Sequence, residues 1–237
     1  MAQVNEENSL VRGLRAGFVD AGSPADDRWS PKVIANNKSK GSDLLTAIKE
    51  QLSICDSFDF CVAFIADSGL QPLVEVFSEL GRRGVRGRLP TSTYLNVNSP
   101  DAFRKLLEYG NIDVRIYQGN LHAKGYVFDS GDTSTVIVGS SNLTQMALTC
   151  NREWNILFRS FGAGGMLRSI KEEFAELWGS AETVRLSSDW ISAYEEYRKS
   201  AAPAKKRLAA FRDEADPTFS TSGRKGKITP NAMQAQA

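Results

Sequence analysis

The sequence predicts an α/β fold in which a mixed β-sheet is sandwiched by helices. Short apolar runs rich in β-branched and aromatic residues alternate along the chain with longer segments whose apolar residues recur at helical spacing. An alternation of this kind typically builds a sheet with helices packed on it. The chain has 237 residues, 41% of them hydrophobic, which is enough to bury one sizeable core.

Three regions are expected along the chain. Residues 1–41 are polar and rich in Gly, Asn and Lys, which predicts an irregular arm with a short strand over 10–18 and an extended piece over 32–35. The folded domain extends over 42–212. It begins with a helix for which Ser42 is the expected N-cap, because a serine hydroxyl can accept a backbone N–H.

Strands and helices alternate through the rest of the predicted domain. Pro90 argues against a central, fully paired position at that residue, since proline has no backbone N–H to give to a neighbouring strand. The predicted elements, in chain order, are a strand over 58–65, a helix over 70–83, a strand over 85–94, a helix over 99–109, strands over 111–117, 121–128, 135–138 and 153–158, and helices over 166–178 and 190–211.

The most informative stretch is 121–129, Leu-His-Ala-Lys-Gly-Tyr-Val-Phe-Asp, followed by Val-Ile-Val-Gly-Ser-Ser-Asn at 136–142. Alternate residues of a strand share a face, so His122 and Lys124 are expected to project side by side. The second run ends in small residues, which allow a backbone turn to come close to a ligand. An imidazole, an ammonium, hydroxyls and a carboxamide can therefore converge on one point, a set of groups that suits a phosphate.

This stretch resembles the HKD motif of the phospholipase D superfamily. In single-motif nucleases of that superfamily a glutamate orients the histidine, and Glu153 stands at about that place here. The resemblance implies the α/β sandwich of that superfamily and a phosphodiesterase activity. It is carried by His122, Lys124, Asp129, Gly139, Ser140 and Asn142.

The resemblance also implies a mechanism. Neutral His122 attacks a phosphodiester phosphorus, and water resolves the phosphohistidine intermediate. Lys124, Asn142 and the Ser140 hydroxyl hold the non-bridging oxygens and stabilise the charge of the transition state. Glu153 accepts from the other imidazole nitrogen and so fixes its tautomer.

Structural alternatives exist for several of these residues. A lone histidine on a strand is more often a packing residue, but His122 is the only histidine in the chain and falls where the motif requires one. Ser140 and Ser141 are candidates for binding the substrate or simple turn residues. Glu153 can instead be a solvated strand end. Asp129 is expected to be structural, holding the strand exit or its loop.

The count of histidines predicts an assembly. The superfamily uses a second histidine to protonate the leaving oxygen, and one chain supplies only His122. Two copies should therefore meet across a two-fold axis in a homodimer with a shared active site. Apolar residues are needed near the rim of such an interface, and Tyr126, Trp154 and Met146 are the candidates.

Composition limits the other possibilities. The net charge is +1, so any basic surface must be local, and the longest apolar run is too short to span a membrane. The polar, acidic N-terminus is unlike a signal peptide. Cys55, Cys61 and Cys150 are scattered, which predicts reduced core residues of a cytoplasmic protein. With one histidine and no clustered cysteines, we expect neither a metal site nor another cofactor.

The tail, residues 213–237, is expected to be a linker followed by the start of a truncated domain. Residues 199–227 carry eight basic and three acidic side chains, typical of a solvated tail or of an electrostatic contact with nucleic acid. Residues 227–237, with Pro-Asn-x-x-Gln, resemble the opening of a superfamily II helicase core. Taken with the motif, residues 42–237 resemble the N-terminal nuclease-like domain of bacterial DEAD/DEAH-type helicases, some of them restriction or defence proteins.

These observations predict a metal-independent endonuclease acting on nucleic acid, DNA more than RNA, as part of a longer helicase polypeptide. Two other functions share the motif. One is a lipid phosphodiesterase, which the lack of a predicted membrane anchor disfavours. The other is a non-catalytic module that keeps the pocket to grip a backbone phosphate.

Overall fold

The computed structural model describes residues 28–37, 43–93 and 98–200. The chain divides into two compact units, 1–194 and 195–237, and the eight-stranded sheet lies in the first. The predicted strand over 10–18, the end of the last helix beyond residue 200, and the linker and helicase-like tail fall outside the described residues.

A mixed sheet of eight strands confirms the predicted α/β class. The strand order is β1-β7-β6-β5-β2-β3-β4-β8; β2, β3 and β4 are parallel to one another and every other pair is antiparallel. The strands are β1 (Lys32–Ile34), β2 (Ser57–Val62), β3 (Arg86–Ser92), β4 (Ile112–Tyr117), β5 (Lys124–Ser130), β6 (Thr133–Gly139), β7 (Asn155–Phe161) and β8 (Thr183–Arg185).

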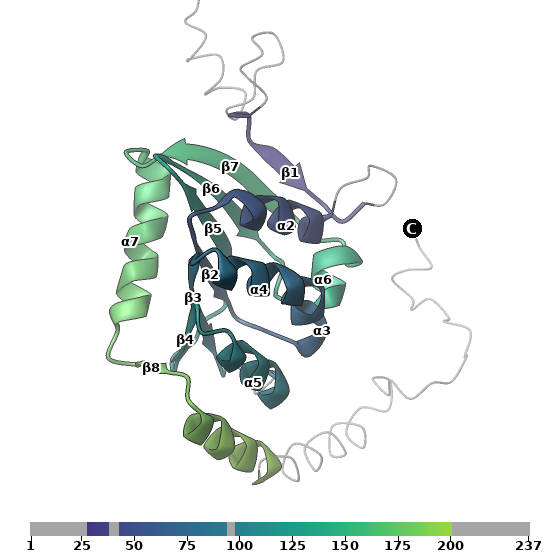
Figure 1. Cartoon of the computed structure of the whole chain (residues 1–237), viewed down its shortest axis with the longest axis vertical. Coiled ribbons are helices and arrows are strands. Elements are labelled where there is room, and N and C mark those ends of the chain that lie inside the picture. Colours follow the sequence, from purple (N-terminus) through teal and green to yellow (C-terminus); the bar gives the residue numbers. More distant parts are fainter. Residues whose placement is uncertain (1–27, 38–42, 94–97, 201–237) are drawn as a thin grey trace, which may run out of the picture. The chain divides into compact units, whose positions relative to one another are not determined.

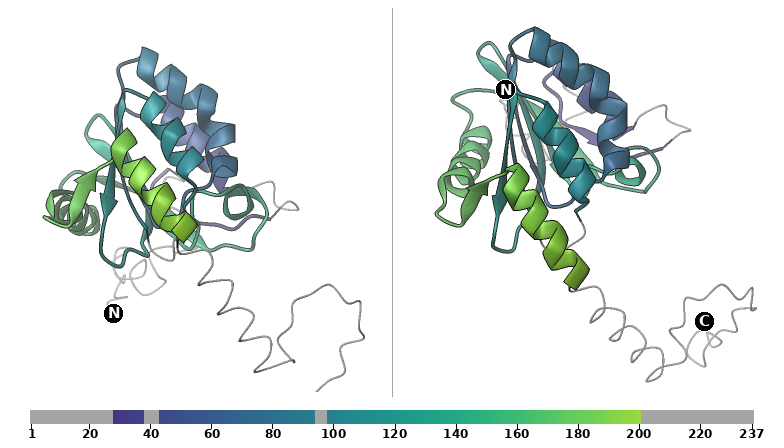
Figure 2. Two further views of the ribbon diagram at one scale, coloured as in Figure 1. Left: turned by 90° about the horizontal axis from the view of Figure 1, so that it is seen from below. Right: turned by 60° about the horizontal axis from the view of Figure 1, so that its bottom comes forward.

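Helices cover the two faces of the sheet unequally (Figures 1 and 2). The helices between β1 and β7 lie on one face, and α7 lies on the other. A further helix over 188–200 follows β8. The remaining helices are α2 (Leu44–Ile54), α3 (Asp67–Leu70), the 3-10 turn η2 (Gln71–Leu73), α4 (Val74–Arg82), α5 (Pro100–Glu108), α6 (Gln145–Thr149) and α7 (Gly165–Gly179).

The larger core lies between the sheet and the first group of helices. Alternate residues of β2 and β5 point into it, and register pairs Phe60 with Tyr126 and Phe58 with Phe128. The Phe60 ring packs edge-on against Tyr126 and Phe128, with centroids 4.9 and 5.5 Å apart. Fully burying an aromatic side chain of this size contributes on the order of 1.5–3 kcal/mol, so this aromatic cluster is a main reason that β2 and β5 pair.

On the other face, α7 is fastened by apolar packing and by one arginine. Leu167 packs with Val127 and Val136 in a small second core. Arg88 donates two hydrogen bonds to Asp59, at 2.7 and 2.5 Å, and its guanidinium lies 4.7 Å from the centre of the Phe174 ring. The ion pair and the cation–π contact together hold the C-terminal half of α7 against β3.

Several boundaries differ from the prediction for local reasons. The N-cap of α2 is Asp43, whose carboxylate accepts from the Thr46 N–H at 2.7 Å, whereas Ser42 lies outside the described residues. The helix predicted over 70–83 is divided into α3, η2 and α4, because Pro72 lacks the N–H of a continuous helix.

Pro90 lies in a central strand, but where that strand is paired on one side only. The pairing of β3 with β2 ends at Arg88, whereas the pairing with β4 continues through Pro90 to Ser92. Pro90 therefore avoids pairing on both sides, as predicted, although its strand lies inside the sheet.

The cysteine prediction was correct for one residue and wrong for another. Cys55 is buried and Cys61 is half-buried, but Cys150 is exposed just after α6. All three are free thiols. Burial raises the pKa of Cys55 to about 11 and that of Cys61 to about 12, so both are protonated thiols near neutral pH.

A test of the packing around α3 follows from Gly69. A Cβ at this position would lie 2.1 Å from the Leu143 carbonyl oxygen, and that backbone cannot yield easily. We expect Gly69→Ala to lower the free energy of unfolding by about 1–3 kcal/mol, as overpacking does elsewhere. Urea denaturation measures it, with Gly165→Ala as the control, since a Cβ there meets nothing within 4 Å. Equal stabilities would contradict the tight approach.

Candidate active site

Three segments of the chain meet at one edge of the sheet. Strands β5, β6 and β7 are neighbours in antiparallel order, so the start of β5, the end of β6 and the start of β7 lie together. The motif residues occupy those ends: His122 and Lys124, the turn 140–142, and Glu153. The fold thus brings together the two halves of the motif, which the sequence separates.

His122 and Lys124 occupy different environments. The strand begins at Lys124 and not at residue 121, so His122 precedes it, although the Ala63 N–H still donates to the Ala123 carbonyl at 3.2 Å. His122 is exposed, whereas Lys124 is 7% exposed. The Lys124 ammonium donates to the His122 carbonyl oxygen at 2.5 Å. This hydrogen bond fixes the cation directly beside the histidine.

The ring of Phe64 forms the wall next to both residues. It stands edge-on to the His122 imidazole with centroids 6.0 Å apart, and the Lys124 ammonium lies 5.7 Å from its centre. Burial lowers the pKa of Lys124 from its ordinary value of 10.5, while the charge of Glu153 and, more weakly, Cys61 oppose that change. The site therefore holds a cation that is poorly solvated and well suited to pair with an anion.

The turn after β6 approaches the backbone of β7 very closely. A Cβ at Gly139 would lie 2.2 Å from the Trp154 carbonyl oxygen, so only glycine fits there. The Ser140 N–H donates to that same carbonyl at 3.1 Å. The Ser140 hydroxyl accepts from the Trp154 N–H at 3.2 Å and donates to the Glu153 carboxylate.

This arrangement changes the interpretation of Ser140. Its hydroxyl proton is directed at Glu153, which also accepts from the Asn151 amide at 3.4 Å. We therefore treat Ser140 as a residue that positions Glu153, in place of a direct contact with phosphate oxygens. The orienting role of Glu153 toward His122 stays a prediction.

Asn142 keeps a hydrogen-bond donor available. Its side-chain oxygen accepts from the Phe64 N–H at 3.2 Å, and the Leu143 N–H donates to the Phe64 carbonyl at 3.0 Å. Its amide nitrogen makes no hydrogen bond to any residue that the structure describes. A phosphate oxygen can use that donor without breaking an existing contact.

Two further predicted residues do not present a side chain at the site: that of Ser141 is turned into the protein, and Asp129 lies at the other end of β5. Ser141 is fully buried and its hydroxyl accepts from Asn155 at 2.9 Å, so the expected contact with substrate is wrong for its side chain. Asp129 is at the far end of β5, roughly 17 Å along the strand at about 3.3 Å per residue. Its carboxylate accepts from Lys171 at 2.7 Å and from Ser134, which ties α7 to the β5–β6 hairpin.

A cleft of about 520 Å³ opens between this edge of the sheet and α7. His122 and Lys124 contribute its polar wall together with Asp59 and Glu173. The rest of the lining is largely apolar and comes from Leu121, Val127, Val138, Ile170, Phe174 and Leu177. Of the motif residues, His122, Lys124 and Gly139 therefore line a groove that is large enough for part of an organic substrate.

Buried asparagines support the site, and the sequence analysis missed them. Asn98 donates to the Ala63 carbonyl at 3.1 Å and accepts from the Ile65 N–H at 2.6 Å. Asn36 donates to the Ala147 carbonyl at 2.7 Å. Asn155 donates to Ser141. Each of these hydrogen bonds joins two separate segments of the chain, so no local pattern indicated the asparagines. The position of Phe64 at the site was also not predicted, because the sequence placed Phe64 in a strand.

Comparison with a protein-family model identifies the fold family. The model described as "cardiolipin synthase, PLD-like domain" matches residues 45–178, more than half of the chain. The chain belongs to this PLD-like family. The match contains every motif residue discussed above, and it confirms the superfamily expected from the HKD pattern.

The PLD-like domain resembles several solved structures. Nuc from Salmonella typhimurium, a phospholipase D family member, is 21% identical with a TM-score of 0.52; the match covers 67% of this chain and all of Nuc. NucT from Helicobacter pylori is 15% identical with a TM-score of 0.54, over 67% and 99% of the two chains. Phosphatidylserine synthase from Haemophilus influenzae Rd KW20 is 14% identical with a TM-score of 0.55, over 85% and 54%. At these identities the similarity concerns the fold.

A search of curated proteins gave no match. Within the described ranges, no group of three or more His, Cys, Asp or Glu side chains could hold a metal ion. None of the helices described has the length and apolar character needed to cross a membrane.

A pH experiment tests the environment of Lys124. Its pKa is lower in the folded state than the ordinary 10.5, so the unfolded chain binds more protons between those two values. Below that pH window the buried charge of Lys124 lowers the free energy of unfolding by a constant amount. As the pH rises through the window, Lys124 loses its proton and this destabilisation is relieved. We expect the stability of the wild type, relative to Lys124→Met, to rise across this alkaline window.

Urea denaturation at a series of pH values measures the difference. Lys49→Met is the matched control, because that lysine lies on α2, away from the motif residues. Parallel profiles for the wild type and Lys124→Met would show that Lys124 is solvated, contrary to its position.

Proposed function

We propose that this chain is a metal-independent phosphodiesterase that cleaves nucleic acid, with DNA favoured over RNA. The observation that carries the proposal is the placement of an exposed imidazole, a buried ammonium and an unused amide donor at one edge of a PLD-like domain. These groups supply a nucleophile, a charge partner and a neutral donor for one phosphate.

The proposed reaction has two balanced steps. An imidazole nitrogen of His122 attacks phosphorus, forming a P–N bond while the P–O bond to the leaving oxygen breaks. That oxygen takes a proton from an acid. Water then attacks phosphorus, the P–N bond breaks and the water's proton returns to the acid. Lys124 and Asn142 stabilise the charge on the non-bridging oxygens in both steps.

The acid in this scheme is the histidine of a second copy, since the chain contains only His122. The candidate interface residues Trp154 and Met146 are 81% and 56% exposed, which supports a partner on this side. Tyr126 is fully buried and donates to the Ser141 carbonyl at 2.9 Å, so it was wrongly expected at the rim. Val138 and Ile156, paired across β6 and β7, add exposed apolar surface next to the cleft.

The proposal includes an association of this nuclease with a helicase. It is supported by the Pro-Asn-x-x-Gln pattern in residues 227–237 and by the resemblance of the motif region. A nuclease coupled to a strand-separating motor would act on DNA that the motor exposes.

A lipid substrate is the second candidate, favoured by the apolar lining of the cleft. Acyl chains of a phospholipid could occupy a groove of that kind while the phosphate reaches His122. The family description and the phosphatidylserine synthase fold support the same alternative. Parallel assays on DNA, RNA and phospholipid vesicles separate the two candidates.

The direct test combines substrate, chelator and His122→Ala. We expect DNA cleavage by the wild type to persist in EDTA, because the mechanism uses no metal ion. His122→Ala and Lys124→Ala should each reduce turnover by about 10³-fold or more, as loss of a nucleophile or charge partner does.

Lys49→Ala is the control for a lysine outside the site, and circular dichroism checks that each variant is folded. Activity that disappears in EDTA and returns with magnesium would contradict the mechanism. Full turnover by folded His122→Ala would exclude His122 as the nucleophile.

Subunit mixing tests the shared site. If each phosphodiester needs both His122 side chains, a one-to-one mixture of wild type and His122→Ala should lose about half its activity as subunits exchange, because mixed dimers are inactive. Sedimentation at micromolar concentration establishes the assembly state. A monomer that hydrolyses the substrate, or an activity unchanged by mixing, would mean that another group protonates the leaving oxygen.

A further inference from the structure

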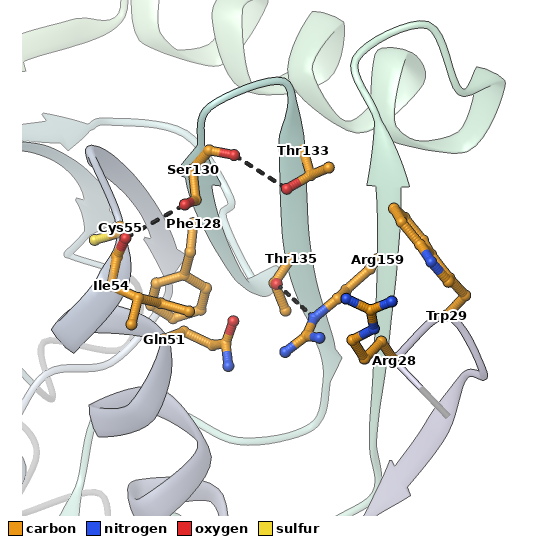
Figure 3. A pocket seen from close by; sticks show the side chains of 10 residues that line it. All are labelled: Arg28, Trp29, Gln51, Ile54, Cys55, Phe128, Ser130, Thr133, Thr135 and Arg159. Carbon is orange, nitrogen blue, oxygen red and sulfur yellow. Dashed lines mark hydrogen bonds between the residues drawn. The ribbon is translucent and has the colours of Figure 1, made fainter. Parts of the chain in front are cut away.

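A second pocket lies at the opposite ends of β5 and β6, on the face of the sheet covered by α2 (Figure 3). Its volume is about 170 Å³. The end of α2 forms one wall, the β5–β6 hairpin forms the floor, and β7 with the segment before β1 closes the other side. Lys124 is six residues from Ser130 along β5, so about 20 Å of strand separate this pocket from the active site.

The pocket is positively charged. Arg28 and Arg159 line it, and none of its ten lining residues is acidic. Arg159 donates through Nε to the Thr135 hydroxyl at 3.3 Å, and no carboxylate among the described residues pairs with its guanidinium. In Figure 3 its terminal nitrogens point into the space beside Gln51. The fork of N–H groups is thus held in place by Thr135 and directed at the cavity.

Nearby acidic side chains are engaged elsewhere. Asp56 accepts from the Gly131 N–H at 2.7 Å, and Asp129 faces α7, where Lys171 and Ser134 donate to it. Neither lines the pocket. The guanidinium of Arg159 therefore has no local counterion inside the cavity.

Gln51 supplies an independent indication of a ligand. Gln51 is only 6% exposed, yet its side-chain amide has no hydrogen-bond partner in the part of the chain that the structure describes. The amide points into the pocket (Figure 3). Neither polar atom of this amide is fully buried, so the amide is available to donate to, or accept from, a molecule in the cavity.

The other polar groups are mostly satisfied. Ser130 donates to the Ile54 carbonyl at 3.3 Å, and Thr133 donates to the Ser130 carbonyl at 3.0 Å. The donors that remain are those of Arg159, Gln51 and the Thr135 hydroxyl. A cavity rich in donors, charged and without acids selects an oxyanion.

We propose that this pocket binds a terminal phosphate group. A volume of about 170 Å³ is enough for a phosphate group of five heavy atoms. Arg159 donates a fork of N–H bonds to two phosphate oxygens, and Gln51 donates to the third. Trp29, stacked on Phe161 at 4.7 Å, leaves an aromatic surface beside the opening on which a base can stack.

Inorganic phosphate, a mononucleotide and a 5′-phosphorylated DNA end share this chemistry, and calorimetric titration of each distinguishes the sources. The His122→Ala, Lys124→Ala double variant of the full chain serves as the host, so that phosphate cannot be bound or turned over at the active site. We expect one phosphate bound per chain, and binding weakened about tenfold or more by Arg159→Gln. Arg159→Lys should lose part of the affinity, since it keeps the charge without the fork.

Gln51→Met separates a binding role from a structural one. Methionine fills the same volume without a buried amide, so we expect weaker phosphate binding together with equal or greater stability. Arg82→Gln on α4, whose side chain is 74% exposed, is the charge-matched control and should leave binding unchanged. Tighter binding of a mononucleotide or a DNA 5′-phosphate than of inorganic phosphate identifies the source.

Two results would overturn the proposal. One is the absence of binding by all three ligands at millimolar concentration. The other is an equal loss of binding in Arg82→Gln and Arg159→Gln, which would indicate general attraction of anions to a basic surface.

Discussion

The geometry of the active site depends on one backbone contact, that between the segment after β2 and the turn after β6. Leu143 and Ile65 form an isolated parallel bridge, and Asn142 and Leu143 both hydrogen-bond to Phe64. Phe64 in turn lies beside His122 and Lys124. A shift of this contact would move the amide donor of Asn142 and the aromatic wall of Phe64 relative to His122 and Lys124.

The two faces of the sheet perform different tasks. The face under α2, α4 and α5 buries the aromatic core. The face under α7 is only partly covered, so the cleft and the exposed side chains of Val138 and Ile156 lie together there. In the proposed dimer, substrate access and contact with a second copy would use the same surface.

The sequence was sufficient for the features that depend on local pattern. Strand periodicity predicted the sheet, and the motif predicted that His122, Lys124 and Asn142 lie close together. It failed where a long-range contact decides the outcome. Nothing near Ser141 indicates that Asn155 covers it, and the single-sided pairing at Pro90 depends on where β2 ends. The buried asparagines and the phosphate pocket likewise join segments that are distant in the chain.

Strand β1 has a consequence for the order of folding. Strands β5, β6 and β7 follow one another in the chain and pair in that order. By contrast, Ile34 of β1 lies opposite Asn155 of β7, at a separation of 121 residues. Contacts of such high contact order form late, because a long loop must close first. Until β1 docks, β7 is an open edge with exposed Ile156, a template for pairing with another chain. Docking of β1 therefore covers the side of β7 at which another chain could pair.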